Sequence, residues 1–129
     1  MQAKRREDEI TSIVIEQCIS IHKKIGPGLF ESVYEKILAR ELREKGIDIH
    51  CQVPIKIFYK GVDFGVGFRA DMVIEDLVIL EIKSVEHILP LHEKQLMTYL
   101  KLTGKTVGLL LNFDVDVFKT GIKRIVNNY

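Results

Sequence analysis

Glu81 and Lys83 are the residues of this sequence whose position most clearly calls for a chemical explanation. They follow directly on the apolar run Leu77–Leu80, which predicts a strand in the interior of a sheet. Because side chains alternate along a strand, Glu81 and Lys83 share one face and Ile82 points to the other. A carboxylate and an ammonium at the end of an apolar strand are costly unless they are paired, hydrated or bound to a metal ion. We therefore expect both residues to belong to a site.

Asp71 is the third member that we expect in this site. It precedes a second apolar run, Met72–Ile74, and the acidic pair Glu75–Asp76 between the two runs predicts the turn of a β-hairpin. Two carboxylates a few ångströms apart either share a proton or recruit a cation. Carboxylate oxygens suit Mg²⁺ or Mn²⁺ better than zinc, and the carbonyl oxygen of Ile82 can add a further ligand. Lys83 can then orient or deprotonate a metal-bound water, or neutralise charge on a phosphorus centre.

The hairpin must satisfy a geometrical condition for the two carboxylates to meet. A two-residue turn at Glu75–Asp76 would place Asp71 opposite Leu80, on the face of the sheet away from Glu81. A connection of three residues, or one bulge, brings Asp71 opposite Glu81 on the same face. The metal hypothesis therefore predicts an odd-length turn or a bulge, and a regular two-residue hairpin would count heavily against it.

A helix predicted over Leu89–Leu102 follows the buried strand directly, so its first turns can lie beside the site. Gln95 and Tyr99 are four residues apart and share a face of this helix. Gln95 can hydrogen-bond Lys83, a metal-bound water or a phosphate, while Tyr99 packs below it. Each also has an ordinary structural interpretation. Gln95 can be a solvent-facing amide, and Tyr99 can be a core residue whose hydroxyl reaches solvent. Glu31, in the first turn of an earlier helix, is either a surface acid that complements the helix dipole or an acid directed at the sheet.

The remaining elements place this hairpin in a mixed sheet. They are helices over Glu7–Lys24 and about Leu29–Lys45, and strands over Cys51–Tyr59, Thr106–Asn112, Val117–Lys119 and Ile122–Val126. Pro54 indicates an edge or a bulge in its strand, and Leu29 and Val33 are expected in the core stripe of their helix. The order α-α-β-β-β-α-β-β predicts an α/β fold with a mixed sheet of about four to six strands flanked by helices.

Composition and charge narrow the classes of function. A chain of 129 residues that is 47% hydrophobic and 29% charged suits one globular domain over residues 1–129. The apolar runs are too short to cross a bilayer and the first residues are charged, so we expect a cytoplasmic protein without a membrane partner. A formal net charge of +1 means that phosphate binding must rest on local clusters. Cys18 and Cys51 lack metal-type spacing and are expected as buried free thiols, with a disulfide as the alternative. His92 is expected at the surface.

Taken together, these motifs resemble the PD-(D/E)XK nuclease superfamily in its RecB-like branch. Asp71, Glu81–Lys83 and Gln95–Tyr99 match its ordered pattern D…ExK…QxxxY. A more specific match is Gly28–Tyr34 (GLFESVY), which resembles the signature of the small GxxExxY proteins placed in that superfamily. The likeness extends from about Ile13 to Asn127.

This resemblance implies a restriction-endonuclease-like core and a Mg²⁺-dependent hydrolase of phosphodiester bonds. It implies that Asp71 and Glu81 are metal ligands and that Lys83 is the catalytic lysine. Gln95 and Tyr99 would be supporting residues. Glu31 would be the helix acid of the core, either as an outer metal ligand or as a partner for Lys83.

Three functions are open at this level. The first is a metal-dependent nuclease in which a metal-associated water attacks nucleic acid in line, with DNA favoured over RNA as the substrate. The second is a non-catalytic module for assembly or nucleic-acid binding, in which the charged residues form a structural ion-pair network. The third is an enzyme acting on another phosphate-containing substrate. Because cutting two strands usually takes two sites, a homodimer with C₂ symmetry is also expected, with Val115–Val126 as its contact.

Overall fold

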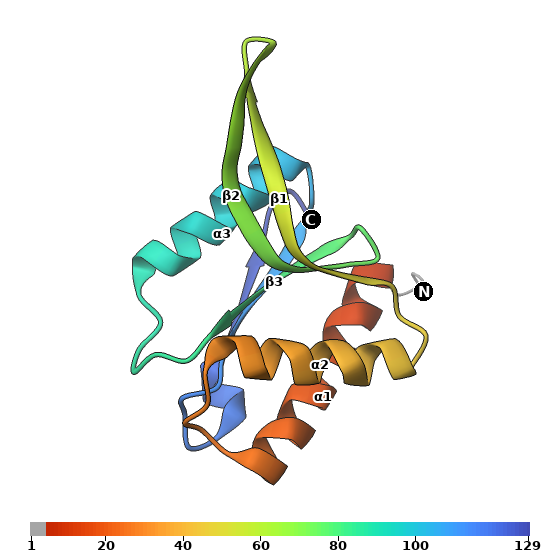
Figure 1. Cartoon of the computed structure of the whole chain (residues 1–129), viewed down its shortest axis with the longest axis vertical. Helices are drawn as coiled ribbons and strands as arrows, with labels where there is room; N and C mark the ends of the chain where they lie inside the picture. The colour runs from red at the N-terminus through yellow and green to blue at the C-terminus, as the bar shows by residue number, and fades with distance from the viewer. Residues whose placement is uncertain (1–4) are drawn as a thin grey trace.

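A five-stranded mixed sheet with helices on both faces forms the body of the protein in the computed structural model (Figure 1). The structure describes residues 5–129, so the first four residues of the predicted single domain lie outside the described range. The helices are α1 (Arg6–Ile25), α2 (Glu31–Glu44), α3 (Pro90–Thr103) and the short 3₁₀-helix η1 (Phe118–Gly121). The strands are β1 (Ile49–Tyr59), β2 (Val62–Ile74), β3 (Val78–Lys83), β4 (Val107–Asn112) and β5 (Ile122–Val126). Within residues 5–129, no helix is both long enough and apolar enough to cross a membrane.

The strands lie side by side in chain order, β1-β2-β3-β4-β5. β3 and β4 run in parallel, as expected for two strands joined through a helix, and the other neighbours are antiparallel. The two central strands are buried along almost their whole length. A charged side chain on β3 is therefore held in the interior of the protein.

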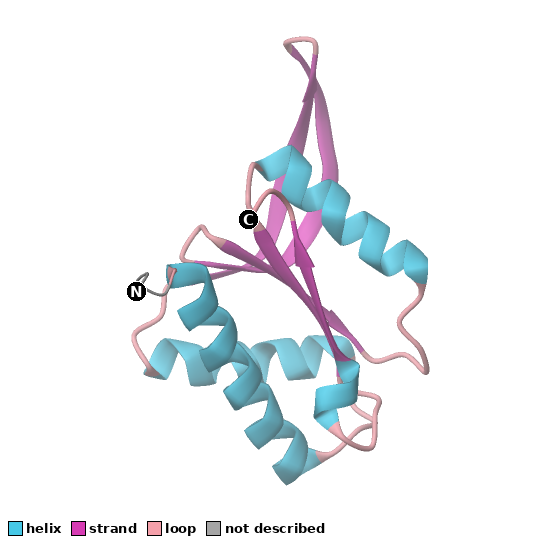
Figure 2. Ribbon diagram, turned by 180° about the vertical axis from the view of Figure 1, so that it is seen from behind, coloured by secondary structure: helices cyan, strands magenta, loops and turns pink. Residues whose placement is uncertain are grey.

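The sheet separates helices on its two sides (Figure 2). Each side has its own hydrophobic cluster. On one face, α1 and α2 pack over a cluster that includes Leu80 and Ile82. On the other face, α3 packs over Ile79 and Leu110. Since side chains alternate along β3, Glu81 points to the α3 face. The prediction that Ile82 points away from Glu81 is confirmed.

The edge strand β1 carries Pro54, which confirms the interpretation of that proline as an edge signal. Cys51 on the same strand and Cys18 in α1 are both free thiols, as predicted. Cys18 is buried as expected, whereas Cys51 is only half-buried because β1 is an edge strand. Leu29 and Val33 do not join the core as expected, and both are exposed. Leu29 precedes α2, which begins only at Glu31. Val33 lies within α2 but outside its buried stripe, which is formed by Tyr34, Leu38 and Leu42.

The segment before β5 also differs from the prediction, because Val117–Lys119 is not a strand. Phe118 begins the 3₁₀-helix η1 and enters the core, where its ring lies 4.8 Å from that of Phe113. Gly121 then passes so close to the backbone carbonyl of Asn112 that a Cβ atom would not fit. A tight helical turn meets both requirements, whereas an extended strand does not turn the chain back onto β4.

Candidate active site

The connection between β2 and β3 contains three residues, Glu75–Leu77, because Ile74 pairs with Val78. Glu75 and Asp76 adopt φ angles of 50° and 55°, and the Leu77 N–H donates to the Ile74 carbonyl at 2.9 Å. These positive φ values are those of a type I′ turn with one residue added. The predicted odd-length turn is confirmed. It continues the register so that Asp71 falls opposite Glu81.

Two ion pairs fasten this turn to other elements. The Arg6 guanidinium of α1 donates two hydrogen bonds of 2.8 Å to the Glu75 carboxylate. Lys105, in the loop after α3, reaches Asp76 at 2.9 Å. The pKa values of Glu75 and Asp76 are lowered mainly by these hydrogen bonds from Arg6 and Lys105. The turn is thus held by α1 on one side and by the loop after α3 on the other.

Asp71 lies where β2 and β3 separate. The paired residues of the two strands end at Met72 and Leu80, and beyond them the Asp71 Oδ2 atom accepts a hydrogen bond from the Ile82 N–H at 2.8 Å. The N–H and carbonyl of one strand residue point toward the same neighbouring strand, so the Ile82 carbonyl also faces β2. The carboxylate of Asp71 and the carbonyl of Ile82 therefore lie on the same side of β3.

Glu81 is the most unusual group in the structure. Its side chain is 7% exposed, and its Oε1 atom has no hydrogen-bond partner among residues 5–129. Burial, followed by repulsion from the Asp71 carboxylate, raises the pKa of Glu81 to about 9, and the charge of Lys83 opposes this rise. In the absence of a cation the Glu81 carboxyl is therefore neutral at pH 7. A buried oxygen without a partner beside a second carboxylate is an environment that a cation would satisfy.

The α3 face supplies Tyr99, and Gln95 lies one turn earlier on the same helix. Burial raises the pKa of the Tyr99 hydroxyl, and the carboxylates of Glu81 and Asp71 raise it further. The Tyr99 ring stacks on Phe68 of β2 with a centroid separation of 3.7 Å. Gln95 is exposed on α3. Tyr99 thus stands near the two acids, while the supporting role of Gln95 stays a prediction.

His92 has a structural role at the start of the same helix. Its Nδ1 atom accepts a hydrogen bond of 3.0 Å from the backbone N–H of Leu89, the residue that precedes α3. This contact forms half of a capping box, which satisfies a backbone donor at the helix terminus. The side chain is half-buried rather than at the open surface as expected.

Glu31 connects α2 to the end of β3. Its Oε2 atom accepts a hydrogen bond from the backbone N–H of Ser84 at 2.8 Å, and the Ser84 hydroxyl donates to the Leu29 carbonyl at 3.1 Å. Ser84 directly follows Lys83, so this pair of bonds fixes the strand end that carries the lysine. Of the two interpretations of Glu31, the geometry favours the acid directed at the sheet.

Two further residues of the site, Glu35 and Gln52, were missed by the sequence analysis. Gln52 donates from Nε2 to Glu35 at 2.7 Å and to Asp71 at 3.4 Å. Glu35 is 8% exposed, and burial raises its pKa while the hydrogen bond from Gln52 opposes the rise. Glu31 and Glu35 are four residues apart and so share one helix face, which is the signal that could have identified Glu35.

Gln52 also has an unusual backbone. It lies within β1 at a φ of 53°, a region that costs a non-glycine residue energy. Its carbonyl accepts a hydrogen bond from the Arg69 guanidinium at 3.3 Å. Such strain persists only where the surrounding contacts hold it, and here they are the bonds that Gln52 makes to Glu35 and Asp71.

A pocket of about 200 Å³ opens where these elements meet. Its lining consists of Glu31, Ser32, Glu35, Gln52, Asp71 and Ile82. Three of these residues come from α2, one from β1, one from β2 and one from β3. The pocket therefore gives access to the Asp71 carboxylate from the α2 side.

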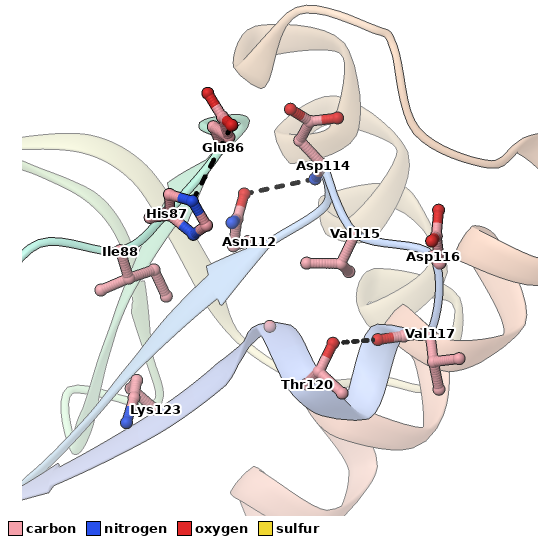
Figure 3. A pocket seen from close by; sticks show the side chains of 11 residues that line it. Glu86, His87, Ile88, Asn112, Asp114, Val115, Asp116, Val117, Thr120 and Lys123 are labelled. Atoms are coloured by element: carbon pink, nitrogen blue, oxygen red, sulfur yellow. Dashed lines mark hydrogen bonds and ion pairs between the residues drawn. The ribbon is translucent and has the colours of Figure 1, made fainter.

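A larger pocket, of about 630 Å³, lies beyond the end of β4 (Figure 3). Asn112 at its margin accepts hydrogen bonds from the N–H groups of Val85 and Asp114 and donates to the Val85 carbonyl. This buried amide ties the loop after β3 to the loop after β4. Asn112 pairs with Lys83 across the two strands, so this larger pocket borders the site without containing any of its acids.

Comparison with known proteins decides the family. A sequence profile of the PD-(D/E)XK nuclease superfamily matches residues 8–125. The chain belongs to this superfamily. No curated protein sequence gives a significant match.

Two solved structures resemble this PD-(D/E)XK domain. SSO0001 is 19% identical with a TM-score of 0.53, and the match covers 93% of this chain and 78% of that one. An alkaline exonuclease from Laribacter hongkongensis, LHK-Exo, is 20% identical with a TM-score of 0.48, over 70% of this chain and 52% of that one. The chain thus spans about half the length of LHK-Exo. The likeness to SSO0001 is one of fold alone. The order of helices and strands in this chain is that of the predicted restriction-endonuclease-like fold.

PD-(D/E)XK nucleases generally use divalent metal ions, and the residues present fit such an ion. No group of three or more His, Cys, Asp or Glu side chains within residues 5–129 is arranged to hold a metal. The expected ligands are instead two carboxylates, Asp71 and Glu81, with the carbonyl of Ile82. Mg²⁺ usually keeps several waters, so two carboxylates are a sufficient protein contribution. The unpartnered Oε1 atom of Glu81 is the observation that favours this fit.

Proposed function

We propose that this protein is a Mg²⁺- or Mn²⁺-dependent nuclease that hydrolyses phosphodiester bonds by attack of a metal-associated water. The observation that carries the proposal is the buried Glu81, whose Oε1 atom has no partner among residues 5–129 and whose pKa is raised by burial and by the neighbouring Asp71 carboxylate. Membership of the PD-(D/E)XK nuclease superfamily supports a nucleic-acid substrate.

Each side chain has a role that follows from its position. Asp71, Glu81 and the carbonyl of Ile82 would hold the cation, which when bound acidifies water and stabilises charge on the phosphate. The Ile82 N–H and Gln52 orient the Asp71 carboxylate. Lys83, on the face of Glu81, orients or deprotonates the attacking water, or stabilises negative charge on the phosphate.

The supporting residues act through this centre. Glu31 fixes the strand end after Lys83 through the Ser84 N–H, and it is also placed to serve as an outer ligand beside Asp71. Tyr99 bounds the site on the α3 side, and Gln95 would contact the phosphate or a bound water. Cleavage assays of variants at Glu31, Gln95 and Tyr99 would distinguish these proposed roles.

We also infer that the chain belongs to the small GxxExxY proteins of the superfamily. Each residue of the motif has a distinct structural task, which supports the assignment. Gly28 adopts a φ of 110°, which suits glycine alone. The buried Tyr34 hydroxyl donates to the Gly26 carbonyl at 2.6 Å and accepts from the Leu29 N–H at 3.2 Å. With Glu31 bound to the end of β3, the motif joins the start of α2 to the catalytic strand.

The test of the function is cleavage of labelled DNA and RNA, single- and double-stranded, with Mg²⁺, Mn²⁺ or EDTA. We expect metal-dependent cleavage, with DNA as the preferred substrate, that falls at least about 100-fold in Asp71→Ala and in Lys83→Ala. Lys24→Ala, an exposed lysine at the end of α1, is the matched control and should cleave normally. Cleavage that persists in both site variants would contradict the proposal. A folded protein that binds nucleic acid, but neither binds metal nor cleaves the substrate, would support the non-catalytic alternative.

A further inference from the structure

β1 and β2 continue beyond the sheet as a two-stranded arm (Figure 1). β2 pairs with β3 only through Met72–Ile74, whereas β1 and β2 stay paired as far as Tyr59 and Val62. The inner part of this extension rests on α3 through the stacking of Phe68 on Tyr99. The outer part, residues 56–66, projects from the body and is called the arm below (Figure 2).

The arm exposes three aromatic rings. Phe58, Tyr59 and Phe64 are 61%, 63% and 65% exposed, and the valines at positions 62 and 66 are exposed beside them. A two-stranded ribbon cannot bury both of its faces, so apolar side chains on it need another reason. Large exposed apolar groups that gather in one place mark an interaction site.

The shape of the arm keeps these rings turned outward. The pairing of the strands shifts between Ile55 and Lys56 and again between Lys56 and Phe58, so the ribbon is bulged. Opposite the second shift, the Asp63 carboxylate accepts a hydrogen bond from the Gly65 N–H at 2.8 Å, and Gly65 adopts a φ of 85°. Bulges increase the local twist and redirect side chains. Phe64 therefore stands on a turn of the backbone that its neighbours hold in place.

The charges on the arm are mainly positive. Lys56 and Lys60 outnumber its single acid, Asp63, which pairs with Lys56 at 3.6 Å. The Lys60 ammonium lies 5.6 Å from the centroid of the Tyr59 ring, at the tip. Aromatic rings with adjacent cations are the combination that binds single-stranded nucleic acid, because bases stack on the rings and the phosphates meet the cations.

We propose that the arm binds unpaired bases of the substrate, so that the substrate is nucleic acid with a single-stranded segment. This inference rests on the proposed nuclease function. A protein partner fits the arm less well, since a stable interface needs about 20–30 residues a side and its centre is depleted of charge. The arm has eleven residues, and its tip carries a lysine.

The arm and the site share a strand. Phe64 precedes Asp71 by seven residues on β2, a separation of at most about 23 Å at the rise of an extended strand. At about 3.4 Å per nucleotide, this corresponds to roughly seven stacked nucleotides. A bound strand can therefore occupy the arm and the site together, and shorter strands should lose the contribution of the arm.

The test measures binding by fluorescence anisotropy in EDTA, where cleavage does not interfere. The probes are a labelled single strand of about 20 nucleotides, as DNA and as RNA, the corresponding duplex, and an abasic strand with the same number of phosphates. The variant Phe58→Ser/Tyr59→Ser/Phe64→Ser should bind the single strand at least about tenfold more weakly than the wild type. Its affinity for the abasic strand should not change. Leu89→Ser/Leu91→Ser, two exposed apolar residues at the start of α3, is the matched control and should bind normally.

Three results would overturn the proposal. The first is that the arm variant binds the single strand as tightly as the wild type does. The second is that the wild type binds abasic and base-containing strands equally well. The third is that light scattering shows a dimer for the wild type and for the control variant but a monomer for the arm variant. Circular dichroism and thermal unfolding of each variant establish that it is folded. Arm-dependent binding without any cleavage in Mg²⁺ would contradict the nuclease and leave the arm assignment standing. Normal cleavage and binding by the arm variant would contradict the arm assignment alone.

Discussion

At the scale of single residues, the charge of Asp71 and burial disfavour the ionised form of Glu81 until a cation binds both carboxylates. The sequence was sufficient to select Asp71, Glu81 and Lys83, because polar groups next to an apolar strand are conspicuous. It was not sufficient for Glu35, which reads as one surface acid among several on a charged helix. Its spacing of four residues from Glu31 indicates the shared helix face, but its burial depends on the approach of Gln52 from β1, a contact between elements that this spacing does not predict.

The pKa of Glu81 leads to a prediction about stability. A carboxyl whose pKa rises from 4.5 to about 9 on folding binds its proton more tightly in the folded state, so stability falls as pH rises between these values. In EDTA, the free energy of unfolding of Glu81→Gln should equal that of the wild type near pH 5. At pH 8 it should exceed the wild-type value by roughly 2 to 4 kcal/mol. Urea denaturation at the two pH values measures this. A variant that is less stable than the wild type at pH 8 would contradict the raised pKa of the buried Glu81 carboxyl.

Gln52 allows the backbone and the side chain to be tested separately. Gln52→Ala removes the hydrogen bonds to Glu35 and Asp71 but keeps a side chain at a φ of 53°, whereas Gln52→Gly also relieves the backbone. The glycine variant should therefore be more stable than the alanine variant by about 1 kcal/mol. Both should lose activity to a similar extent if the amide orients Asp71. Thermal unfolding and cleavage rates measured side by side give the answer, and full activity in both would leave Gln52 without a role in the site.

At the scale of elements, the length of the β2–β3 turn controls which face Asp71 occupies. The alternation of the two strands led to the condition of an odd-length turn, and the three residues Glu75–Leu77 meet it. The sequence did not predict η1, because Val117–Lys119 has the composition of a strand. The decisive constraint there is the contact of Gly121 with the backbone of Asn112 on β4, which exists only in the folded chain.

The turn can be shortened to test this control. Deleting Leu77 converts the connection to two residues and should move Asp71 to the face away from Glu81. We expect the loss of metal binding by calorimetry and of cleavage. The matched control replaces Glu75–Asp76 with Asn-Gly and keeps Leu77, since these residues accept positive φ and preserve the length. Metal affinity that survives the deletion in a folded protein would show that the register does not matter.

At the scale of the whole molecule, the main body contains the proposed metal site and the arm contains the proposed contact with unpaired bases. The sequence indicated a strand followed by a glycine-rich return, but not that both extend beyond the sheet, since that depends on where β3 ends. The expected dimer contact, Val115–Val126, is partly internal, because Phe118 and Gly121 are buried. A homodimer remains a prediction, to be measured by light scattering.

The arm carries only two lysines, so few phosphate contacts and a weak dependence of nucleic-acid binding on salt are expected. If the lysines of the arm, Lys56 and Lys60, provide the main phosphate contacts, the slope of log K against log salt for single strands should be about −1 to −2. Anisotropy titrations at several salt concentrations measure the slope. A much steeper slope would assign the affinity to many cations elsewhere on the surface rather than to stacking on the arm.

Anomalous scattering from a crystal soaked in Mn²⁺ tests the metal centre most directly. We expect a peak between the carboxylates of Asp71 and Glu81, close to the carbonyl of Ile82, and no peak there in Glu81→Gln. A well-ordered site without manganese at a saturating concentration, or a peak that persists unchanged in the variant, would contradict the assignment of these residues as the metal centre.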